Sequence, residues 1–370
     1  MQMAIKREER RPFAPLTRRH SMKSKKVLTV LLLLLAAIFP ASMTLAQNQA
    51  DAGNSGKVVV ANRASGTISV IDTHTDELLG TYDLPAGEND PEPMYVVFTR
   101  TGNRVFVGDR ANDQVVVFRA RDFSVETVIP AGEGVFHMWA DAGATQLWVS
   151  NDVDNTMTVI NPATLAVEAT VDLPADLVAM GGKPHDVILS PQGDYAYVTM
   201  LGFAGDHDYL VQYDTHTFSE MNRAPVGKDP HVSLTFHNEF IYVPAQNSDL
   251  VSVFNRHTLD LVDEIVAPGA HGAGMPLHGQ VFYTTNLTGG GTDGLITIDL
   301  RTNTILGATD TPYAVPHNIA LTPAADKLYV THSGGTSDKV TVYEIGADDL
   351  PVLVGEVTVE FNPFGLSYVP

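Results

Sequence analysis

The chain of 370 residues contains no cysteine. Without thiolates it cannot attach c-type haem covalently, hold a cysteine-ligated iron–sulfur cluster or a blue-copper centre, or use a thiol nucleophile. The sequence also lacks a Gly-x-Ser-x-Gly elbow, a P-loop, a dinucleotide-binding Gly-x-Gly-x-x-Gly and a His-Glu-x-x-His zinc motif. Any chemistry must therefore rest on other residues.

Basic residues are few, with 23 Lys and Arg against 43 Asp and Glu. Without residues 1–46 the count is 14 basic against 41 acidic residues, a net charge of −27. An anionic surface repels phosphate backbones, so we expect no nucleic-acid partner. The negative charge favours the binding of cations and of basic partners. The alternative is that it only keeps the protein soluble in a salty or extracellular setting.

The longest apolar run, VLTVLLLLLAAIF at residues 27–39, is too short to span a bilayer comfortably. A basic MKSKK segment precedes it, and a proline and small residues follow it, as in a secretory signal peptide. We predict a signal peptide at residues 1–46, starting from Met1 or Met22, and a flexible segment at 47–55. The mature protein is then periplasmic or secreted and has no stable membrane span; the alternative is an uncleaved anchor.

After the leader, short strands rich in Val, Ile and Tyr alternate with Gly, Asp, Asn and Pro, which favours β structure. One unit reads PHDVILSPQGD, YAYVT, LVQYD and EMNRAPV, and such units recur roughly every 40–45 residues, as propeller blades do. Six complete units begin near Pro93, Val135, Pro184, Pro230, Ala270 and Pro316.

A seventh unit is divided between the two ends of the chain. The segment VVVANRASGTISVIDTHTDELLGTYDL supplies three strands, and the terminal FNPFGLSYVP supplies the missing one. We therefore predict an all-β fold over residues 56–370. It is a seven-bladed β-propeller of four-stranded antiparallel blades, closed by pairing of the C-terminal strand with the N-terminal blade, which removes open sheet edges.

The segments VVVANRASGTISVIDTHT, LWVSNDVDNTMTVINPAT and LYVTHSGGTSDKVTVYE resemble the YVTN family of β-propellers. In that family a Tyr-Val-Thr-Asn strand leads through a hairpin to a Val-Ser-Val-Ile-Asp strand. The resemblance covers about residues 56–370 and implies the fold. It leaves the activity open, because relatives include binding proteins, surface proteins, haem d1-binding propellers and dehydrogenase subunits.

The first strand of that family reads roughly Pro-x-Gly-Val-Ala, whereas here histidine repeatedly follows proline. Each copy is followed eleven or twelve residues later by the aromatic residue of the next strand. The inner strands of a propeller line its channel, so we expect five imidazoles to gather at one channel mouth. These are His137, His185, His231, His271 and His317. Met94 and Phe364 take the matching positions in the other two blades.

Imidazole nitrogens suit zinc and copper, and the thioether of Met94 would add a soft donor that suits copper. Two further candidate ligands lie in loops expected on the same face, His207 in FAGDHDYL and His332 in YVTHSGG. Nearby carboxylates could act as ligands or as acceptors for a histidine N–H. The alternative is that repeat duplication copied histidines that only bond to neighbouring blades.

Three functions follow. The first is an exported propeller that binds zinc, copper, a metal cofactor or a small ligand in the channel. It could be a metal carrier that resembles in outline the periplasmic zinc metallochaperone propellers, although QNQADAGNSGK lacks their histidine-rich segment. The second is a copper- or haem d1-dependent oxidoreductase. The third is a metal-free scaffold for a protein partner. A lactonase is less favoured, because no acidic residue accompanies the histidines consistently.

Overall fold

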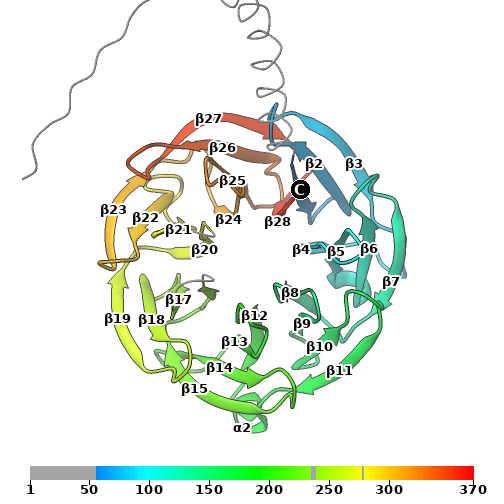
Figure 1. Ribbon diagram of the computed structural model, residues 1–370, viewed down its shortest axis with the longest axis vertical. Helices are drawn as coiled ribbons and strands as arrows, with labels where there is room; N and C mark the ends of the chain where they lie inside the picture. The colour runs from blue at the N-terminus through cyan, green and yellow to red at the C-terminus, as the bar shows by residue number, and fades with distance from the viewer. Residues whose placement is uncertain (1–55, 235–238, 277–278) are drawn as a thin grey trace, which may run out of the picture. The chain divides into compact units, whose positions relative to one another are not determined.

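The computed structural model describes residues 56–234, 239–276 and 279–370. The predicted signal peptide at 1–46 and the segment at 47–55 lie outside the described residues. Seven four-stranded antiparallel sheets surround a central axis (Figure 1). The predicted fold is therefore confirmed.

Each blade runs from an inner strand beside the axis to an outer strand at the rim. Blade 1 contains β28 (Pro363–Val369), β1 (Lys57–Asn62), β2 (Thr67–Asp72) and β3 (Leu78–Asp83), and blade 2 contains β4 (Pro93–Thr99), β5 (Arg104–Asp109), β6 (Gln114–Arg119) and β7 (Val125–Pro130). Blade 3 contains β8 (Val135–Ala140), β9 (Leu147–Asn151), β10 (Thr156–Ile160) and β11 (Val167–Asp172), and blade 4 contains β12 (Lys183–Leu189), β13 (Tyr195–Leu201), β14 (Asp208–Asp214) and β15 (Glu220–Val226).

The remaining blades follow the same order. Blade 5 contains β16 (Ser233–Leu234), β17 (Phe240–Ala245), β18 (Leu250–Asn255) and β19 (Leu261–Val266), and blade 6 contains β20 (Ala270–Gly274), β21 (Val281–Asn286), β22 (Leu295–Asp299) and β23 (Thr304–Thr309). Blade 7 contains β24 (Pro316–Leu321), β25 (Lys327–His332), β26 (Lys339–Ile345) and β27 (Pro351–Thr358). Two short helices, η1 (Arg110–Asn112) and α2 (Ala175–Ala179), connect strands. No helix in the described parts of the chain is long and apolar enough to cross a membrane.

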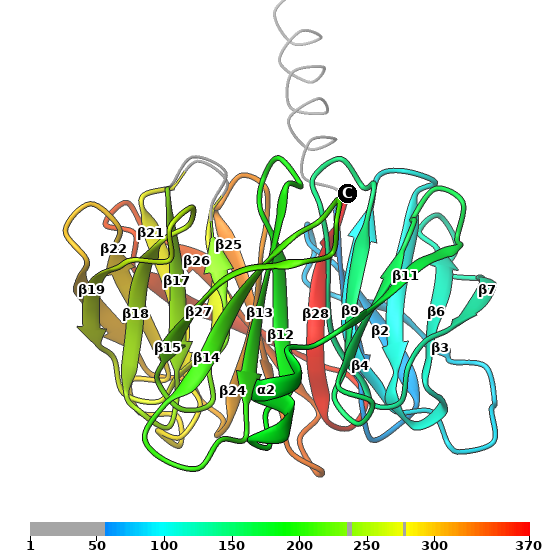
Figure 2. The same ribbon diagram turned by 90° about the horizontal axis from the view of Figure 1, so that it is seen from below.

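The C-terminal strand closes the ring. Strand β28 pairs antiparallel with β1, with Val369 opposite Lys57 and Leu366 opposite Val60. In the side view the blades stand next to one another, and their loops lie on two opposite faces (Figure 2). The seven sheets therefore form a closed ring whose first blade takes strands from both ends of the propeller.

The hydrophobic core is divided among the blade interfaces. Seven clusters of buried side chains lie one between each neighbouring pair of blades. The aromatic residue that follows each histidine motif is fully buried in this packing. These residues are Trp148, Tyr197, Tyr242, Phe282 and Tyr329. Because both faces of a blade are covered, its middle strands read as nearly continuous apolar runs.

Hydroxyl groups on the second strands link neighbouring blades at the level of the histidines. The Oγ1 of Thr331 accepts the N–H of Asn318 at 3.0 Å and donates to the carbonyl of Phe364, in the next blade, at 2.8 Å. The hydroxyl of Thr285 donates in the same way to the carbonyl of His317 at 3.0 Å. These bonds fix the start of β28 and of β24 relative to the blade before each of them.

We expect the Thr331→Val substitution to lower the free energy of unfolding by about 1–3 kcal/mol. The isosteric change leaves a buried backbone N–H of Asn318 without its acceptor, and such unsatisfied groups cost about that much. Urea denaturation of the variant measures the loss. The control is Thr170→Val, because Thr170 is an exposed residue on the outer strand β11. Equal stability of both variants would show that the hydrogen bonds of Thr331, to Asn318 in its own blade and to Phe364 in the next, contribute nothing.

Candidate metal centre and adjoining cavity

A β-bulge lies near the start of the inner strand in six blades. In blade 4, Pro184 pairs with Met200, and Val187 pairs with Val198. Two residues of β12 therefore lie opposite a single residue of β13 between these pairs. The same one-residue shift occurs in blades 1, 2, 3, 6 and 7. Bulges re-aim side chains, and here two successive residues of each inner strand lie at the channel.

We call these the first and second channel positions. The first positions are Met94, Phe136, His185, His231, His271, His317 and Phe364. The second positions are Tyr95, His137, Asp186, Val232, Gly272, Asn318 and Gly365.

The prediction that His137 shares the register of the other histidines is wrong. Val135 pairs with Asn151 at the start of the bulge, so Phe136 takes the first position and His137 the second. The interval to the aromatic residue does not reveal this shift, because His231 and His271 also precede Tyr242 and Phe282 by eleven residues and still take first positions.

The structure nevertheless brings the five histidines together in one buried cluster. Ring centroids lie 4.5 Å apart for His185 and His231, 3.9 Å for His231 and His271, and 4.7 Å for His271 and His317. His137 lies 5.1 Å from both His185 and His231. All five are buried.

Three of these histidines could hold a single metal ion. One nitrogen from each of His137, His185 and His231 lies within 4.8 Å of the others. A zinc–imidazole bond measures about 2.0–2.1 Å, so a common ligand between the three rings would draw the nitrogens closer together. We refer to these three residues as the histidine triad.

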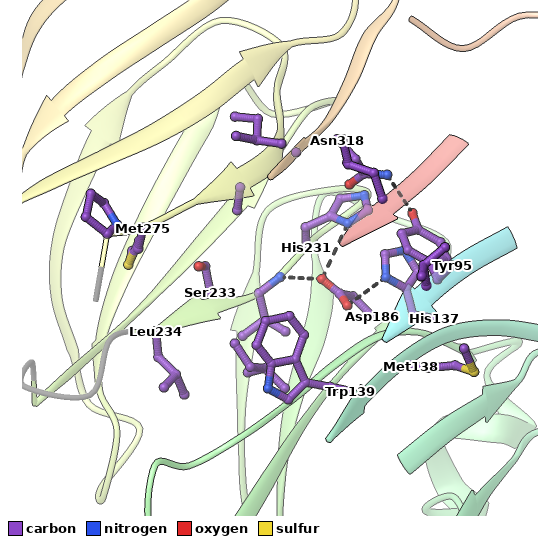
Figure 3. A pocket seen from close by; sticks show the side chains of 18 residues that line it. Tyr95, His137, Met138, Trp139, Asp186, His231, Ser233, Leu234, Met275 and Asn318 are labelled. Carbon is purple, nitrogen blue, oxygen red and sulfur yellow. Dashed lines mark hydrogen bonds and ion pairs between the residues drawn. The ribbon is translucent and has the colours of Figure 1, made fainter. Parts of the chain in front are cut away.

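Each member of the triad faces a carboxylate through its Nδ1 atom. Asp186 lies between two rings, with Oδ1 2.8 Å from Nδ1 of His137 and Oδ2 3.5 Å from Nδ1 of His231 (Figure 3). Asp229 lies 3.4 Å from Nδ1 of His185. The Nε2 atoms of His137 and His231 have no hydrogen-bond partner among the described residues, and neither has Nδ1 of His185, whose contact with Asp229 is too long or poorly aligned for a hydrogen bond. A carboxylate at one ring nitrogen, with the other nitrogen free, is the usual environment of a metal-binding histidine.

Asp186 is held as an ionised carboxylate. Its oxygens accept the backbone N–H groups of Val187 at 2.7 Å and Val232 at 3.0 Å. Burial alone would raise its pKa, but the electrostatic interaction and hydrogen bonds with His137 and His231 bring the pKa well below its usual value. The triad is thus built around a fixed negative charge.

Burial favours the neutral form of two of the three imidazoles. Burial lowers the pKa of His137, and burial and the neighbouring imidazoles lower that of His185 well below its usual value. Neutral imidazole is the form that binds metal ions. The carboxylates of Asp186 and Asp229 beside the rings therefore give this centre negative charge.

Three other predicted ligands lie in or near the ring but outside the triad. His271 is buried, and neither of its ring nitrogens has a hydrogen-bond partner in the described structure. His317 receives a hydrogen bond on Nδ1 from Asn318 at 2.8 Å, and burial lowers its pKa to about 3. Met94 is fully buried at the first position of blade 2.

The structure does not bring His207 to the triad. It is exposed in the loop before β14, where Nδ1 lies 3.1 Å from Asp206 and Nε2 lies 3.2 Å from the hydroxyl of Tyr209.

His332 is buried at the end of β25, and its two nitrogens have partners near its own position. Its Nε2 bonds to the hydroxyl of Thr341 at 2.9 Å, and its Nδ1 lies 3.3 Å from the carbonyl of Ala314. In blade 1 Asn62 takes the equivalent place and donates to Ser69 at 2.9 Å. His332 therefore takes over a hydrogen bond that asparagine makes elsewhere in the ring.

A cavity of about 260 Å³ adjoins the triad. Its polar residues are Tyr95, His137, Asp186, His231, Ser233 and Asn318 (Figure 3). Sequence reasoning singled out only the two histidines of this set. The signal for the others was present, because Asp186 and Asn318 each directly follow a histidine of the repeated motif.

A family profile described as "Lactonase, 7-bladed beta-propeller" matches residues 48–267, which is more than half of the chain. The chain belongs to this family. A comparison with curated proteins finds no match.

Many solved structures share the fold. A proposed 6-phosphogluconolactonase from Bacteroides fragilis is 17% identical, with a TM-score of 0.65 over 86% of this chain and 99% of that one. Hydrazine synthase from Kuenenia stuttgartiensis is 15% identical, with a TM-score of 0.63 over 78% of this chain and 93% of that one.

Dihydro-heme d1 dehydrogenase NirN in complex with DHE is also 15% identical, with a TM-score of 0.59 over 85% of this chain and 75% of that one. At these identities the likeness shows the propeller fold only.

We expect His332→Asn to make the protein less sensitive to acid. Burial lowers the pKa of His332 from 6.5 to about 4. Between these values the unfolded chain binds a proton that the folded protein excludes, so the free energy of unfolding falls as pH falls. Removing this group should reduce that slope by up to about 1.4 kcal/mol per pH unit. Urea denaturation between pH 7 and 4 measures it.

Asparagine is the matched replacement, because Asn62 makes the equivalent bond in blade 1. The exposed His207→Asn variant is the control and should keep the slope of the unchanged protein. An unaltered slope in His332→Asn would contradict the structural role assigned to His332.

Proposed function

We propose that the protein binds one divalent transition-metal ion, zinc or copper, through His137, His185 and His231. The observation that carries this proposal is the set of carboxylates at the Nδ1 atoms, with Asp186 beside two of the rings and Asp229 beside the third. The orphaned Nε2 atoms of His137 and His231 support it, because buried polar atoms without partners are rare in folded proteins.

Charge balance favours a divalent ion. Two carboxylates beside three imidazoles are matched by a dication, whereas without a cation the buried charge of Asp186 has hydrogen-bond donors alone. Three imidazoles also leave a coordination position for an exogenous ligand, which is the arrangement of open zinc sites. The cavity reaches His137 and His231, so that position would face the cavity.

A resident metal ion fits this site better than a carried one. The three side chains are at most 9% exposed, and a carrier has to exchange its metal with a partner at the surface. The close packing of the imidazoles, 3.9–5.1 Å between neighbouring ring centroids, favours a single ion over a planar haem d1.

Hydrolysis of a small cyclic ester is the second candidate function. Membership of the lactonase propeller family supports it, as does the cavity beside the triad. The sequence disfavours this function, because no acidic residue accompanies the histidines consistently. In the structure, however, Asp186 contacts two of the histidines. A bound metal would polarise the ester carbonyl and lower the pKa of water. Asp186 would hold His137 and His231 in one tautomer.

Metal analysis of protein purified without a histidine tag tests the first proposal. We expect about one equivalent of zinc or copper, and loss of that equivalent in the His185→Ala variant. His271→Ala is the matched control, because His271 is equally buried in the same ring but lies outside the triad. A metal-free protein after loading with Zn²⁺ and Cu²⁺ would leave the scaffold alternative. Equal losses in both variants would refute the assignment of the triad.

We also propose that the protein is exported, as its basic and apolar leader suggests. The chain should then be cleaved after residue 46 in a cell that exports it. Intact-mass measurement of the protein from the export compartment checks this. A mature protein that still contains residues 27–39 would indicate a membrane anchor instead.

The YVTN assignment is kept as a hypothesis within the lactonase propeller family. The support for it is that the two residues of such a Ser-Asn or Thr-Asn pair make different hydrogen bonds. Ser150 bonds to the carbonyl of His185 in the next blade at 2.9 Å, and Asn151 bonds to Thr158 within its own blade at 2.9 Å.

A further inference from the structure

The cavity beside the triad has a polar end and apolar walls. At the polar end are two members of the triad, His137 and His231, with Asp186, Tyr95 and Asn318. The walls are formed mainly by Trp139, Ile188, Leu234, Met275, Ile319 and Leu366. Pockets for drug-sized ligands measure about 300–1,000 Å³, so the 260 Å³ found here suits a small molecule.

No lysine or arginine lies among the described residues that line this cavity. Its one ionised side chain, Asp186, is negative. Phosphate groups are normally bound by arginine, lysine or helix N-termini. A phosphorylated or otherwise anionic ligand would therefore meet repulsion here, with no compensating cation apart from the metal.

Two arginines on the channel side are stacked on aromatic rings. The guanidinium of Arg63 lies 5.2 Å from the ring centre of Phe364, and that of Arg110 lies 5.5 Å from Phe136. Neither arginine lines the cavity, and both are paired with carboxylates. Tyr95, which does line the cavity, packs against both phenylalanine rings at 5.5 and 5.8 Å. The aromatic residues thus separate the arginines from the cavity.

Two side chains near the triad could orient an oxygen atom of a ligand. Tyr95 stacks on His137 with ring centroids 3.7 Å apart, and its hydroxyl lies 3.4 Å from the amide nitrogen of Asn318 (Figure 3). A ligand oxygen beside the triad would have this hydroxyl as a second partner.

We propose that this cavity binds a small, uncharged and mainly apolar molecule, whose carbonyl or similar oxygen lies at the triad between the metal and Tyr95. The part of the proposal that concerns the oxygen rests on the proposed metal site, whereas the part that concerns the apolar body rests on the walls alone. It excludes phosphorylated sugars as ligands, although a proposed 6-phosphogluconolactonase shares the fold.

A series of neutral alkyl hydroxamates with two, four and six carbons tests both parts. The hydroxamate group binds metal ions, and the alkyl chain would lie against the walls. Trp139 is 46% exposed and lines the cavity, whereas Trp148, the second of the two tryptophans, is fully buried. Tryptophan fluorescence therefore reports binding. We expect affinity to rise about fourfold for each added methylene until the cavity is filled.

The matched variants are Met275→Ala, at the wall, and Met221→Ala, on the outer strand β15, where Met221 is exposed. Only Met275→Ala should reduce the affinity for the six-carbon probe, and it should leave the two-carbon probe nearly unchanged. Thermal melting of both variants verifies that they fold.

The corresponding n-alkanols and the His185→Ala variant separate the two parts of the proposal. A dependence on chain length that persists for alkanols and in His185→Ala, with no advantage for hydroxamates, would support the apolar cavity and refute the metal site. Affinity that is independent of chain length would overturn the cavity proposal, whatever the metal content. So would tighter binding of 6-phosphogluconate than of the six-carbon probe.

Discussion

The buried negative charge of Asp186 is the constraint around which the centre of the propeller is arranged. Removing an ionised carboxylate from water costs several kcal/mol unless donors or cations replace the solvent. Here two backbone N–H groups and the rings of His137 and His231 provide those donors. Because the two rings belong to different blades, Asp186 links blades 3, 4 and 5 and directs the opposite nitrogens of the two imidazoles away from itself. The metal proposal follows from that arrangement, since a dication would balance the charge that the protein has already placed there.

The bulges explain how a repeat fold produces an asymmetric site. Without the bulges, each of these inner strands would place one residue at the level of the channel histidines, and a single layer of side chains would line the channel there. The extra residue adds a second layer, in which the blades differ from one another and three of them carry His137, Asp186 and Asn318. The interblade hydroxyl bonds, such as that of Thr285 to the carbonyl of His317, hold this level fixed. The site therefore arises from departures at one position of an otherwise regular repeat.

The fold could be predicted from the sequence because each blade repeats the same apolar and turn pattern, and because FNPFGLSYVP visibly lacks partners of its own. The clustering of the histidines followed from the same repeat. The exact set that converges could not be predicted, because the bulge displaces His137 by one position and brings it near His185 and His231. His332 was grouped with the ligands because it replaces an asparagine, but the structure shows that it also replaces the hydrogen bond of that asparagine, to Thr341.

The most direct test of this account is a crystal structure of the protein loaded with zinc or copper, with anomalous data collected at the absorption edge of the metal. The account predicts one strong anomalous peak among the three rings, within bonding distance of Nε2 of His137 and of His231 and of a nitrogen of His185, with Asp186 still at the Nδ1 atoms of the first two. A peak only at exposed histidines such as His207, or no peak in the channel, would contradict it.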